Sequence, residues 1–559
     1  MIKTYINKRL ALYLGIFALI NIIQSIFTPI SKDEAYYWMF SQNMAWGYFD
    51  HPPMVAAVIW LGYSIFHNIL GVRIITVILS FLTQIIIWFL IPKEQREKDK
   101  TGYIFALIIV AMPICHIYGF ITTPDVPLLF FGALYLLIFK KFLIKPTLKY
   151  SVLLGVVAAM LMYSKYHGAL IIIFSLLPYL KVLKEKLFYL TALIGIVLFL
   201  PHIYWQYNHN FVTFIYHLSY RSDNVFLYSN IIGYLLNTIL ILNPFVSLFL
   251  FYYLFMGKVK MQNKSLIFIF WGFIAFFGFD SLKSHVEPHW IAIAIIPTVI
   301  FLHNIIVENT KTKGLIVKLI YASLPIVLLA RVVLALPLPL NSEFHKEGKE
   351  FFNALSSFAK DENVVFYDSY SNPAKYEFYT GKKAFASRTI WYHKTQYDLL
   401  DIQDKYNQKK AVCFYKNGGK NWKPLDIVPN AKFKYRIIDK FPVINNLSAN
   451  IESVEKTEND SILKINFKVY NPYDYNVILK NDTACYQFSV VEFCNNGEKH
   501  FFPFTLNTVS FKSNETTYCS ATFTPWELEP NDRIGIAISP YKIDALLISN
   551  LFKFKLNTK

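Results

Sequence analysis

Charged residues are scarce in this chain of 559 residues: Asp, Glu, Lys and Arg make up 16% of it, against about a quarter of an average soluble protein. Hydrophobic residues make up 55% and aromatic residues 18%. The shortage of charge is confined to the first part of the chain, where apolar runs are separated by short basic clusters. Beyond residue 340 the sequence is ordinary polar sequence. A wholly soluble protein is therefore excluded, and a membrane part followed by a polar part is expected.

Cysteine is also scarce. Five cysteines are too few for a disulfide framework, and no CxxC spacing indicates a zinc site. Four of them lie in the polar part, and one bridge among the last three (Cys485, Cys494 and Cys519) is compatible with a location outside the cytoplasm.

The N-terminus lacks a small-residue cleavage site after its basic start and apolar run. We therefore expect a retained first membrane helix instead of a removed signal peptide. No internal repeat and no low-complexity segment is found. The net charge of +18 does not indicate a nucleic-acid partner, because most of the excess lies in short loops between apolar runs.

Eleven apolar runs are long enough to cross a bilayer, which takes about 17–25 residues each. They lie at about 10–27, 71–91, 102–122, 124–140, 150–164, 167–182, 187–205, 229–256, 265–281, 290–307 and 315–337. Lysines and arginines cluster in alternate loops, whereas the opposite loops carry only Lys32, Arg73, Lys165, Arg221 and Lys283. The positive-inside rule then predicts a cytoplasmic N-terminus and an extracytoplasmic C-terminal part.

We expect three domains: a transmembrane domain over 1–340, an α/β domain over 341–442 and a β-sandwich over 443–559. The second combines a helical pattern at 347–360 with strand-like runs such as NVVFYDS and AVCFYK. The third has short alternating runs separated by Asn, Gly, Pro and Asp, which is typical of an antiparallel sandwich.

The most unusual stretch is residues 31–53, SKDEAYYWMFSQNMAWGYFDHPP, between the first two apolar spans. It holds the acids Asp33, Glu34 and Asp50 beside a bilayer, where ionisable groups are costly and mark functional sites. Asp33 and Asp50 are expected to approach each other across a turn. The alternative is that each acid only complements a helix N-terminus.

The same stretch predicts two juxtamembrane helices. Ser31 can cap a helix that begins at Lys32, with Glu34 as its capping-box partner, and Gly47 is expected to end this helix. The Pro-Pro pair suits the first turn of a second helix over 52–69.

Four motifs carry a family resemblance: DEAYYW at 33–38, GYFDHPP at 47–53, TTPDVPLLFF at 122–131 and FYTG at 378–381. Together they resemble bacterial membrane glycosyltransferases related to the protein O-mannosyltransferases and the lipid A aminoarabinose transferases (glycosyltransferase family 39-like, GT-C fold). The resemblance is good over the first third of the chain and does not include the sandwich. It implies a polytopic GT-C membrane domain with juxtamembrane helices.

By this resemblance, the enzyme transfers a sugar from a polyprenyl-phosphate carrier, with inversion, and Asp33 is the base. Inverting transfer needs a carboxylate that takes the acceptor hydroxyl's proton as its oxygen attacks the anomeric carbon. The family often has Glu-Lys before Pro-Pro, where this chain has Asp50-His51. The family's contacts to the carrier or to a metal at this position are therefore not assigned directly to Asp50 and His51.

The predicted site consists of acids and of polar or cationic side chains in the outer loops. The catalytic carboxylates are Asp33, Asp50 and Asp125, and the substrate contacts are Glu34, Tyr37, Tyr48, His51, Lys165, His167, Arg221, His285, Glu287 and His289. Lys165, His167 and Arg221 suit the phosphate leaving group. The alternatives are a helix cap for Asp125, an interfacial lysine for Lys165 and a hydrogen-bonded imidazole for His167.

No cofactor is assigned. His285, Glu287 and His289 with Asp50 or His51 could hold a divalent metal, but their spacing fits no specific zinc motif. Acceptor or headgroup contact is the alternative for these three residues, as is a plain polar helix end.

The predicted partners are a polyprenyl-phosphate sugar, membrane lipids and a lipid A, glycan or protein acceptor at the outer face of the cytoplasmic membrane. The rival function is a lipid-linked sugar flippase. It would require ionisable residues at mid-membrane depth and inverted repeats, whereas the acids here lie in outer loops.

Overall fold

The structure is a computed structural model, and it describes the chain except for the following residues: 1–7, 221–225, 258–262, 309, 337–341, 346, 401, 428–432, 460, 480–485, 495–497, 507–508, 526–531, 542 and 554–559. The chain divides into two compact units, Met1–Gly348 and Lys349–Lys559. The predicted composition boundary at 340 lies close to this division. The predicted further division at 442 stays a prediction.

The first unit is helical. In the part of the chain that the structure describes, its helices are α1 (Lys8–Phe27), α2 (Lys32–Gln42), α3 (Met54–Tyr63), α4 (Ile69–Leu90), α5 (Lys93–Arg96), α6 (Thr101–Ala111), α7 (Pro113–Ile117), α8 (Asp125–Ile144), α9 (Leu148–Ser164), α10 (Gly168–Leu176), η1 (Leu177–Lys184), α11 (Lys186–Asn208), α12 (Val212–Ile215), η2 (Tyr216–Tyr220), α13 (Tyr228–Ile241), α14 (Ser247–Phe255), α15 (Lys264–Asp280), η3 (Pro288–Ala294), α16 (Ile295–Glu308), α17 (Thr310–Ala335) and α18 (Ser342–His345).

Among the described residues, six helical segments are long and apolar enough to cross a membrane: Lys8–Phe27, Ile69–Leu90, Asp125–Ile144, Lys186–Asn208, Pro288–Glu308 and Lys313–Ala335. The chain is therefore a multi-pass membrane protein. The predicted total of eleven spans stays a prediction, because several predicted spans correspond to shorter or interrupted helices. The predicted span at 102–122, for example, is broken before Pro113, whose ring and missing N–H cannot continue a helix.

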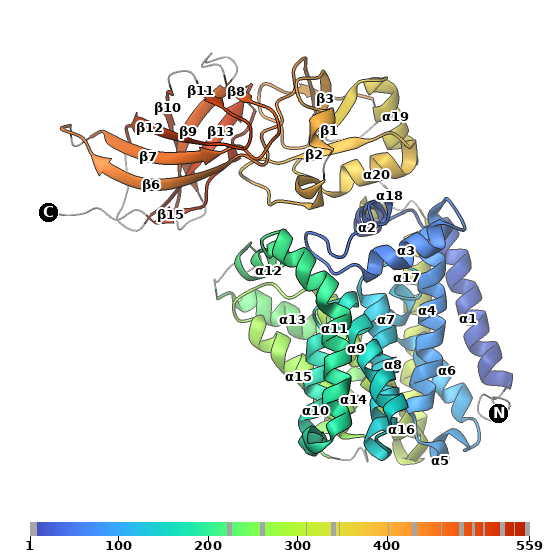
Figure 1. Cartoon of the computed structure of the whole chain (residues 1–559). Coiled ribbons are helices and arrows are strands. Elements are labelled where there is room, and N and C mark those ends of the chain that lie inside the picture. The colour runs from blue at the N-terminus through green and yellow to red at the C-terminus, as the bar shows by residue number, and fades with distance from the viewer. Residues whose placement is uncertain are drawn as a thin grey trace. The chain divides into compact units, whose positions relative to one another are not determined.

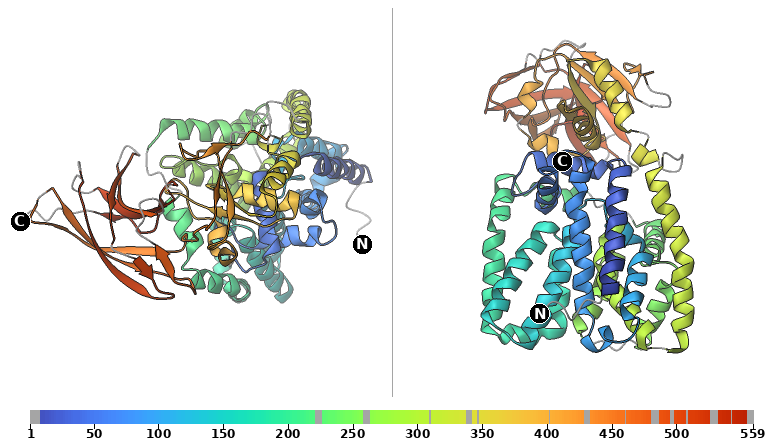
Figure 2. Two further views of the ribbon diagram at one scale, coloured as in Figure 1. Left: turned by 90° about the horizontal axis from the view of Figure 1, so that it is seen from above. Right: turned by 90° about the vertical axis from the view of Figure 1, so that its right-hand side faces the viewer.

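The long helices run side by side (Figures 1 and 2). Helix α9 packs against α8 and α11, α8 packs against α4, and α4 packs against α1 and α3. The segment Pro288–Glu308 is central, since 89% of its most apolar window is buried, whereas only 11% of the window in α11 is buried. The apolar surface of α11 is therefore available to lipid.

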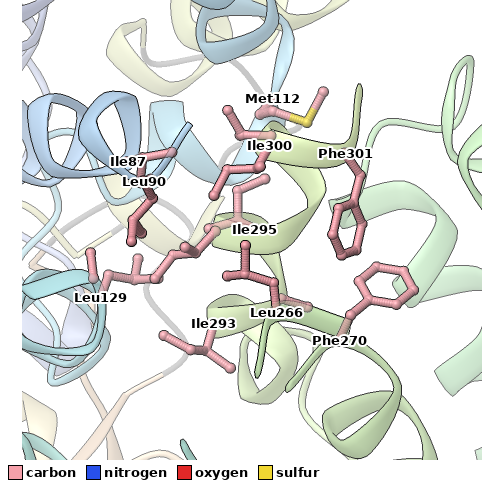
Figure 3. Close-up of a cluster of buried hydrophobic side chains, with 14 of the residues drawn as sticks. Ile87, Leu90, Met112, Leu129, Leu266, Phe270, Ile293, Ile295, Ile300 and Phe301 are labelled. Atoms are coloured by element: carbon pink, nitrogen blue, oxygen red, sulfur yellow. The ribbon is translucent and has the colours of Figure 1, made fainter. Parts of the chain in front are cut away.

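The core of this unit is built from aliphatic and aromatic side chains of helices that are distant in the sequence. Figure 3 shows part of this cluster, in which Phe270 of α15 and Phe301 of α16 lie with ring centroids 5.8 Å apart. Ile293 and Leu129 belong to the same buried cluster. This packing fixes the ends of the helices, from which the polar loops of the site extend.

The second unit begins with a mixed sheet of order β2-β1-β3-β5-β4. Strand β1 pairs in parallel with β2 and β3, whereas β5 runs antiparallel to β3 and β4 antiparallel to β5. The elements are α19 (Lys349–Ala359), β1 (Asn363–Tyr367), α20 (Ser371–Thr380), β2 (Ala384–Ser387), η5 (Gln396–Leu399), η6 (Gln403–Lys405), β3 (Ala411–Tyr415), β4 (Lys423–Pro424) and β5 (Lys434–Ile438).

The remaining strands form antiparallel sheets of orders β10-β9-β13-β14, β12-β7-β6 and β11-β8, with β15 also paired to β13. They are β6 (Ser448–Lys456), β7 (Leu463–Tyr470), β8 (Val477–Leu479), β9 (Tyr486–Phe493), β10 (Lys499–Phe504), β11 (Val509–Phe511), β12 (Thr516–Phe523), β13 (Arg533–Pro540), β14 (Leu546–Leu547) and β15 (Phe552–Lys553). The coarse prediction, a helical membrane part followed by a sheet-rich part, is confirmed.

The structure of this unit corrects part of the disulfide prediction. Cys494 and Cys519 are both unpaired thiols, so no bridge joins them. Cys485 lies outside the described residues.

Candidate active site

Helix α2 begins with the predicted capping box. The Ser31 hydroxyl accepts a hydrogen bond from the Glu34 backbone N–H at 3.1 Å, and the Glu34 carboxylate accepts one from the Ser31 N–H at 3.0 Å. The helix ends earlier than predicted, at Gln42, because the loop that follows leaves the helical path well before Gly47. The second predicted helix is also shorter: α3 starts at Met54, directly after Pro53.

Glu34 is also half of a buried ion pair. Arg73 of α4 donates from Nε to Oε1 at 2.7 Å and from Nη2 to Oε2 at 2.6 Å, and both side chains are fully buried. The Thr122 N–H adds a third contact, to Oε1 at 3.0 Å. Arg73 uses its other hydrogens on backbone carbonyls, those of Ser25, Thr28 and Pro29.

This arrangement holds four segments together: the end of α1, helix α2, helix α4 and the TTPD loop. Burial alone would raise the pKa of Glu34, but the Arg73 charge and the hydrogen bonds from Arg73, Thr122 and Ser31 lower this pKa below its usual value. The structure thus differs from the predicted substrate contact of Glu34. Its carboxylate is occupied inside the protein and positions α2.

Asp125 and Lys165 form a second buried pair. Asp125 is the first residue of α8, Lys165 directly follows α9, and the lysine Nζ donates to Oδ1 at 2.8 Å. Their side chains are 3% and 8% exposed. The sequence predicted both as separate site residues, and the structure brings them together. In this structure Lys165 is paired with an internal carboxylate, and its contact with the phosphate stays a prediction.

The histidines of distant loops gather around His167. Its ring is close enough to interact electrostatically with Lys165, His51, His217 and His289. The ring also lies edge-on to Trp290, with centroids 5.9 Å apart. Its Nδ1 atom is buried and has no hydrogen-bond partner. The structure therefore brings several loops of the helical unit together, and it leaves one buried imidazole nitrogen available for a ligand.

Asp50 and His51 lie at the edge of this group. His51 Nε2 is 3.9 Å from Asp50 Oδ2, and the two side chains are 13% and 21% exposed. His217, which the sequence analysis did not select, hydrogen-bonds through Nε2 to the Asp50 carbonyl at 3.0 Å. The Tyr37 ring packs edge-on against His51 at 5.5 Å between centroids.

Helix α11 fixes the loop between α2 and α3. His202 Nδ1 is 2.6 Å from the Trp46 carbonyl oxygen and therefore carries the proton, which leaves Nε2 to accept from the Tyr166 hydroxyl at 2.8 Å. Gln206 donates to the Tyr166 oxygen at 3.1 Å and to the Thr213 hydroxyl at 2.6 Å. These positioning residues carry no local sequence signal, because they lie about 160 residues from the loop they hold.

Tyr48 is inside the loop and away from solvent. Its hydroxyl donates to the Phe40 carbonyl at 3.0 Å and accepts from the Ala45 N–H at 3.1 Å, while its ring stacks on Phe40 at 4.2 Å. The Thr213 hydroxyl donates to the Tyr48 carbonyl at 3.0 Å. Burial raises the pKa of Tyr48 to about 12. With 0% exposure it supports the loop, in place of the predicted substrate contact.

Asp33, the predicted base, is exposed on the first turn of α2. The Tyr118 hydroxyl interacts electrostatically with both Asp125 and Asp33, which brings the two carboxylates to the same part of the unit. An exposed carboxylate beside a buried polar cluster is accessible to an acceptor hydroxyl. The catalytic roles of Asp33, Asp50 and Asp125 remain predictions.

The other predicted contacts differ in accessibility. Tyr37 is only 7% exposed, His285 is exposed, and Glu287 and His289 are half-buried at the start of η3. Arg221 lies outside the described residues.

The predicted divalent metal has no assembled ligand set among the described residues of this site. Among the described residues of the whole chain, one group of three His, Cys, Asp or Glu residues has ligand atoms within 4.8 Å of one another. This group lies in the second unit.

Comparison with solved structures identifies the architecture. The chain is similar to ArnT from Cupriavidus metallidurans in the apo state, with a TM-score of 0.57, 11% identity and coverage of 76% of this chain and 97% of ArnT. It is also similar to ArnT bound to undecaprenyl phosphate, with a TM-score of 0.51, 12% identity and coverage of 72% and 92%. The predicted resemblance to GT-C glycosyltransferases is confirmed.

Sequence comparison supports the same conclusion over part of the chain. Residues 50–205 match the family described as dolichyl-phosphate-mannose-protein mannosyltransferase. A comparison with curated proteins gives no significant match. The matched GT-C segment starts at Asp50 and includes Arg73, Asp125 and Lys165, so both buried ion pairs have at least one member within it.

Proposed function

We propose that the protein is an inverting membrane glycosyltransferase that moves a sugar from a polyprenyl-phosphate carrier to an acceptor hydroxyl at the outer face of the cytoplasmic membrane. The observation that carries the proposal is the exposed Asp33, which lies near Tyr118 as does Asp125 of the Asp125–Lys165 pair, on a GT-C fold. The same fold is seen in ArnT bound to undecaprenyl phosphate. The family that matches residues 50–205 is also named for a sugar linked to a polyprenyl phosphate.

The reaction needs one base and one site for the leaving group. Asp33 takes the acceptor hydroxyl's proton while the hydroxyl oxygen forms a bond to the anomeric carbon. The bond between that carbon and the carrier phosphate breaks, and its electron pair leaves with the polyprenyl phosphate. Inversion follows from attack on the face opposite the leaving group.

Lys165 and His167 are the proposed contacts of the phosphate. Lys165 holds a hydrogen bond to Asp125 in this structure, and His167 has a buried nitrogen without a partner. A phosphate at this position replaces Asp125 as an acceptor for Lys165, and charge-assisted bonds of this kind are the strong ones in a site of low dielectric. Asp50 and His51 line the same group of loops.

The test is the release of polyprenyl phosphate. Purified protein, given a polyprenyl-phosphate sugar and a membrane acceptor extract, should release the carrier, and Asp33→Asn should abolish release by removing the base. The matched control is Asp99→Asn, an exposed acid in the loop between α5 and α6, which should retain activity.

Full activity of a folded Asp33→Asn variant would show that the base is another group. If carrier lipid moves between leaflets without any turnover, the flippase function replaces the transferase.

A further inference from the structure

The hairpin of β9 and β10 carries three metal-ligating side chains outside the membrane unit. Glu492 on β9 lies directly opposite His500 on β10 in the antiparallel register. Cys494 follows two residues after Glu492, and its N–H donates to the Glu498 carbonyl at 3.0 Å as the hairpin turns. Side chains two residues apart on a strand point to the same face, so Glu492, Cys494 and His500 converge.

The distances within this group match those of a tetrahedral zinc site. His500 Nδ1 is 3.0 Å from Glu492 Oε2 and 3.7 Å from Cys494 Sγ, and the three ligand atoms all lie within 4.8 Å. Zinc bonds of about 2.3 Å to sulfur and 2.0–2.1 Å to nitrogen or oxygen, at tetrahedral angles, separate S from N by about 3.6 Å and N from O by about 3.3 Å. The side chains are therefore already placed at the spacing that the ion requires.

A further carboxylate, that of Asp532 just before β13, lies next to Glu492. Glu492 pairs with Ile534 on β13, and Asp532 lies two residues before Ile534, on the same face of the sheet. The Asp532 carboxylate is hydrogen-bonded to Glu492. Asp532 is not among the three residues whose ligand atoms all lie within 4.8 Å of one another, so its carboxylate has to move closer to become the fourth ligand.

Without a cation, the neighbouring carboxylates of this group are unfavourable. Glu492 is 1% exposed, and its carboxyl group is hydrogen-bonded to that of Asp532. Two adjoining carboxylates in a buried position repel each other unless a proton or a cation lies between them. The Cys494 thiol, one of the unpaired cysteines, lies 3.7 Å from Nδ1 of His500 in the same group.

We infer that Glu492, Cys494, His500 and Asp532 form a structural site for a divalent transition metal, with Zn²⁺ the ion that best suits mixed thiolate, imidazole and carboxylate ligands. The bound ion ties the β9–β10 hairpin to the start of β13 at one end of the sheet. Its function is to stabilise the sheet-rich unit, and it takes no part in glycosyl transfer.

The experiment uses the full-length protein in detergent, stripped with a chelator and titrated with Co²⁺. The wild type should bind one Co²⁺ with the visible absorption of a tetrahedral ion and a thiolate-to-metal charge-transfer band, and Zn²⁺ should displace it. The thiolate band separates this site from any metal bound by the histidines and acids of the membrane unit. Cys494→Ser should lose the band, and His500→Gln should weaken Co²⁺ binding by at least about tenfold.

Cys519→Ser is the matched control, since Cys519 is an unpaired thiol on β12 that is not part of the cluster. It should keep the band and the Zn²⁺-dependent rise in melting temperature that Cys494→Ser loses. A band that survives Cys494→Ser, or no thiolate band in the folded wild type, overturns the proposal.

A second measurement needs no variant. Zn²⁺ should protect Cys494 of the wild-type protein from alkylation, as read by mass spectrometry, and should leave the labelling of Cys519 unchanged. Equal labelling of Cys494 with and without Zn²⁺ also overturns the proposal.

Discussion

Asp33 and Glu34 are adjacent in the sequence but have different environments. Asp33 is exposed at the start of α2, whereas Glu34 is fully buried and bonded to Arg73, Thr122 and Ser31. Successive helical residues differ by about 100° in direction, so one of the two faces the membrane unit and the other faces outward. Asp33 therefore carries the proposed chemistry of α2, whereas Glu34 attaches α2 to the rest of the unit.

Removal of the Arg73 charge tests this attachment. Arg73→Met leaves the Glu34 carboxylate buried without its counter-ion, and breaking such a pair costs about 3–5 kcal/mol. We expect a large loss of thermal stability in detergent, together with loss of carrier release. Lys93→Met is the control, because Lys93 and Glu97 form an exposed pair at 3.6 Å, which contributes about 0–1 kcal/mol. Equal melting temperatures for Arg73→Met and the wild type would contradict the proposed attachment.

Local patterns in the sequence predicted part of this site. The spacing of Ser31 and Glu34 predicted a helix cap, which the structure contains. Arg73 was recognised only as a cation of an outer loop, and Lys165 as a contact of the phosphate. Their bonds to acids 39 and 40 residues away depend on helix packing, which no local pattern encodes.

At the scale of elements, the loop between α2 and α3 depends on α11. Gly47 lies against the Trp205 ring so closely that an added Cβ would be 2.4 Å from a ring carbon. Gly47 was predicted to end a helix. In the structure its lack of a side chain instead allows the Trp205 ring to lie close to the backbone. Hydrophobic patterns predicted the long helices and some of the strands, such as β1 and β3, because apolar residues recur along them. They could not predict where Pro113 and the loop after Gln42 interrupt the helices.

Gly47→Ala should therefore disturb the loop without unfolding the unit. The new methyl group must displace either Trp205 or the loop that carries Asp50 and His51, so we expect lower carrier release with a small loss of thermal stability. Gly15→Ala in α1 is the control, since its Cβ would meet nothing within 4 Å. If Gly47→Ala releases the carrier at the wild-type rate, the position of the loop does not limit turnover.

At the scale of the whole molecule, each compact unit has its own core. The hydrophobic clusters of Lys349–Lys559 contain only residues of that unit, and one cluster combines strands of the mixed sheet with those of the antiparallel sheets. The composition changes near residue 340, close to the division after Gly348, because lipid and water select different residues. Composition could not predict this shared core, which depends on which apolar faces meet.

The shared core predicts how the second unit folds. Residues 349–559 produced alone should form a soluble, β-rich protein with one cooperative unfolding transition. Residues 443–559 alone should be less stable, because they lose the contacts of Val365, Phe385 and Cys413 in the shared cluster. Circular dichroism during thermal unfolding measures both. Equal melting temperatures would instead support a separate sandwich domain.

The several bonds of Glu34 also affect how mutagenesis of this enzyme would be interpreted. A screen that scores only product formation would rank Glu34 and Asp33 together, because loss of either should silence the enzyme. The phenotypes have different origins, since one variant keeps a correctly placed helix and the other does not. Only a parallel assay of carrier binding or melting temperature would distinguish a side chain that holds the helix in place from one that takes part in the reaction.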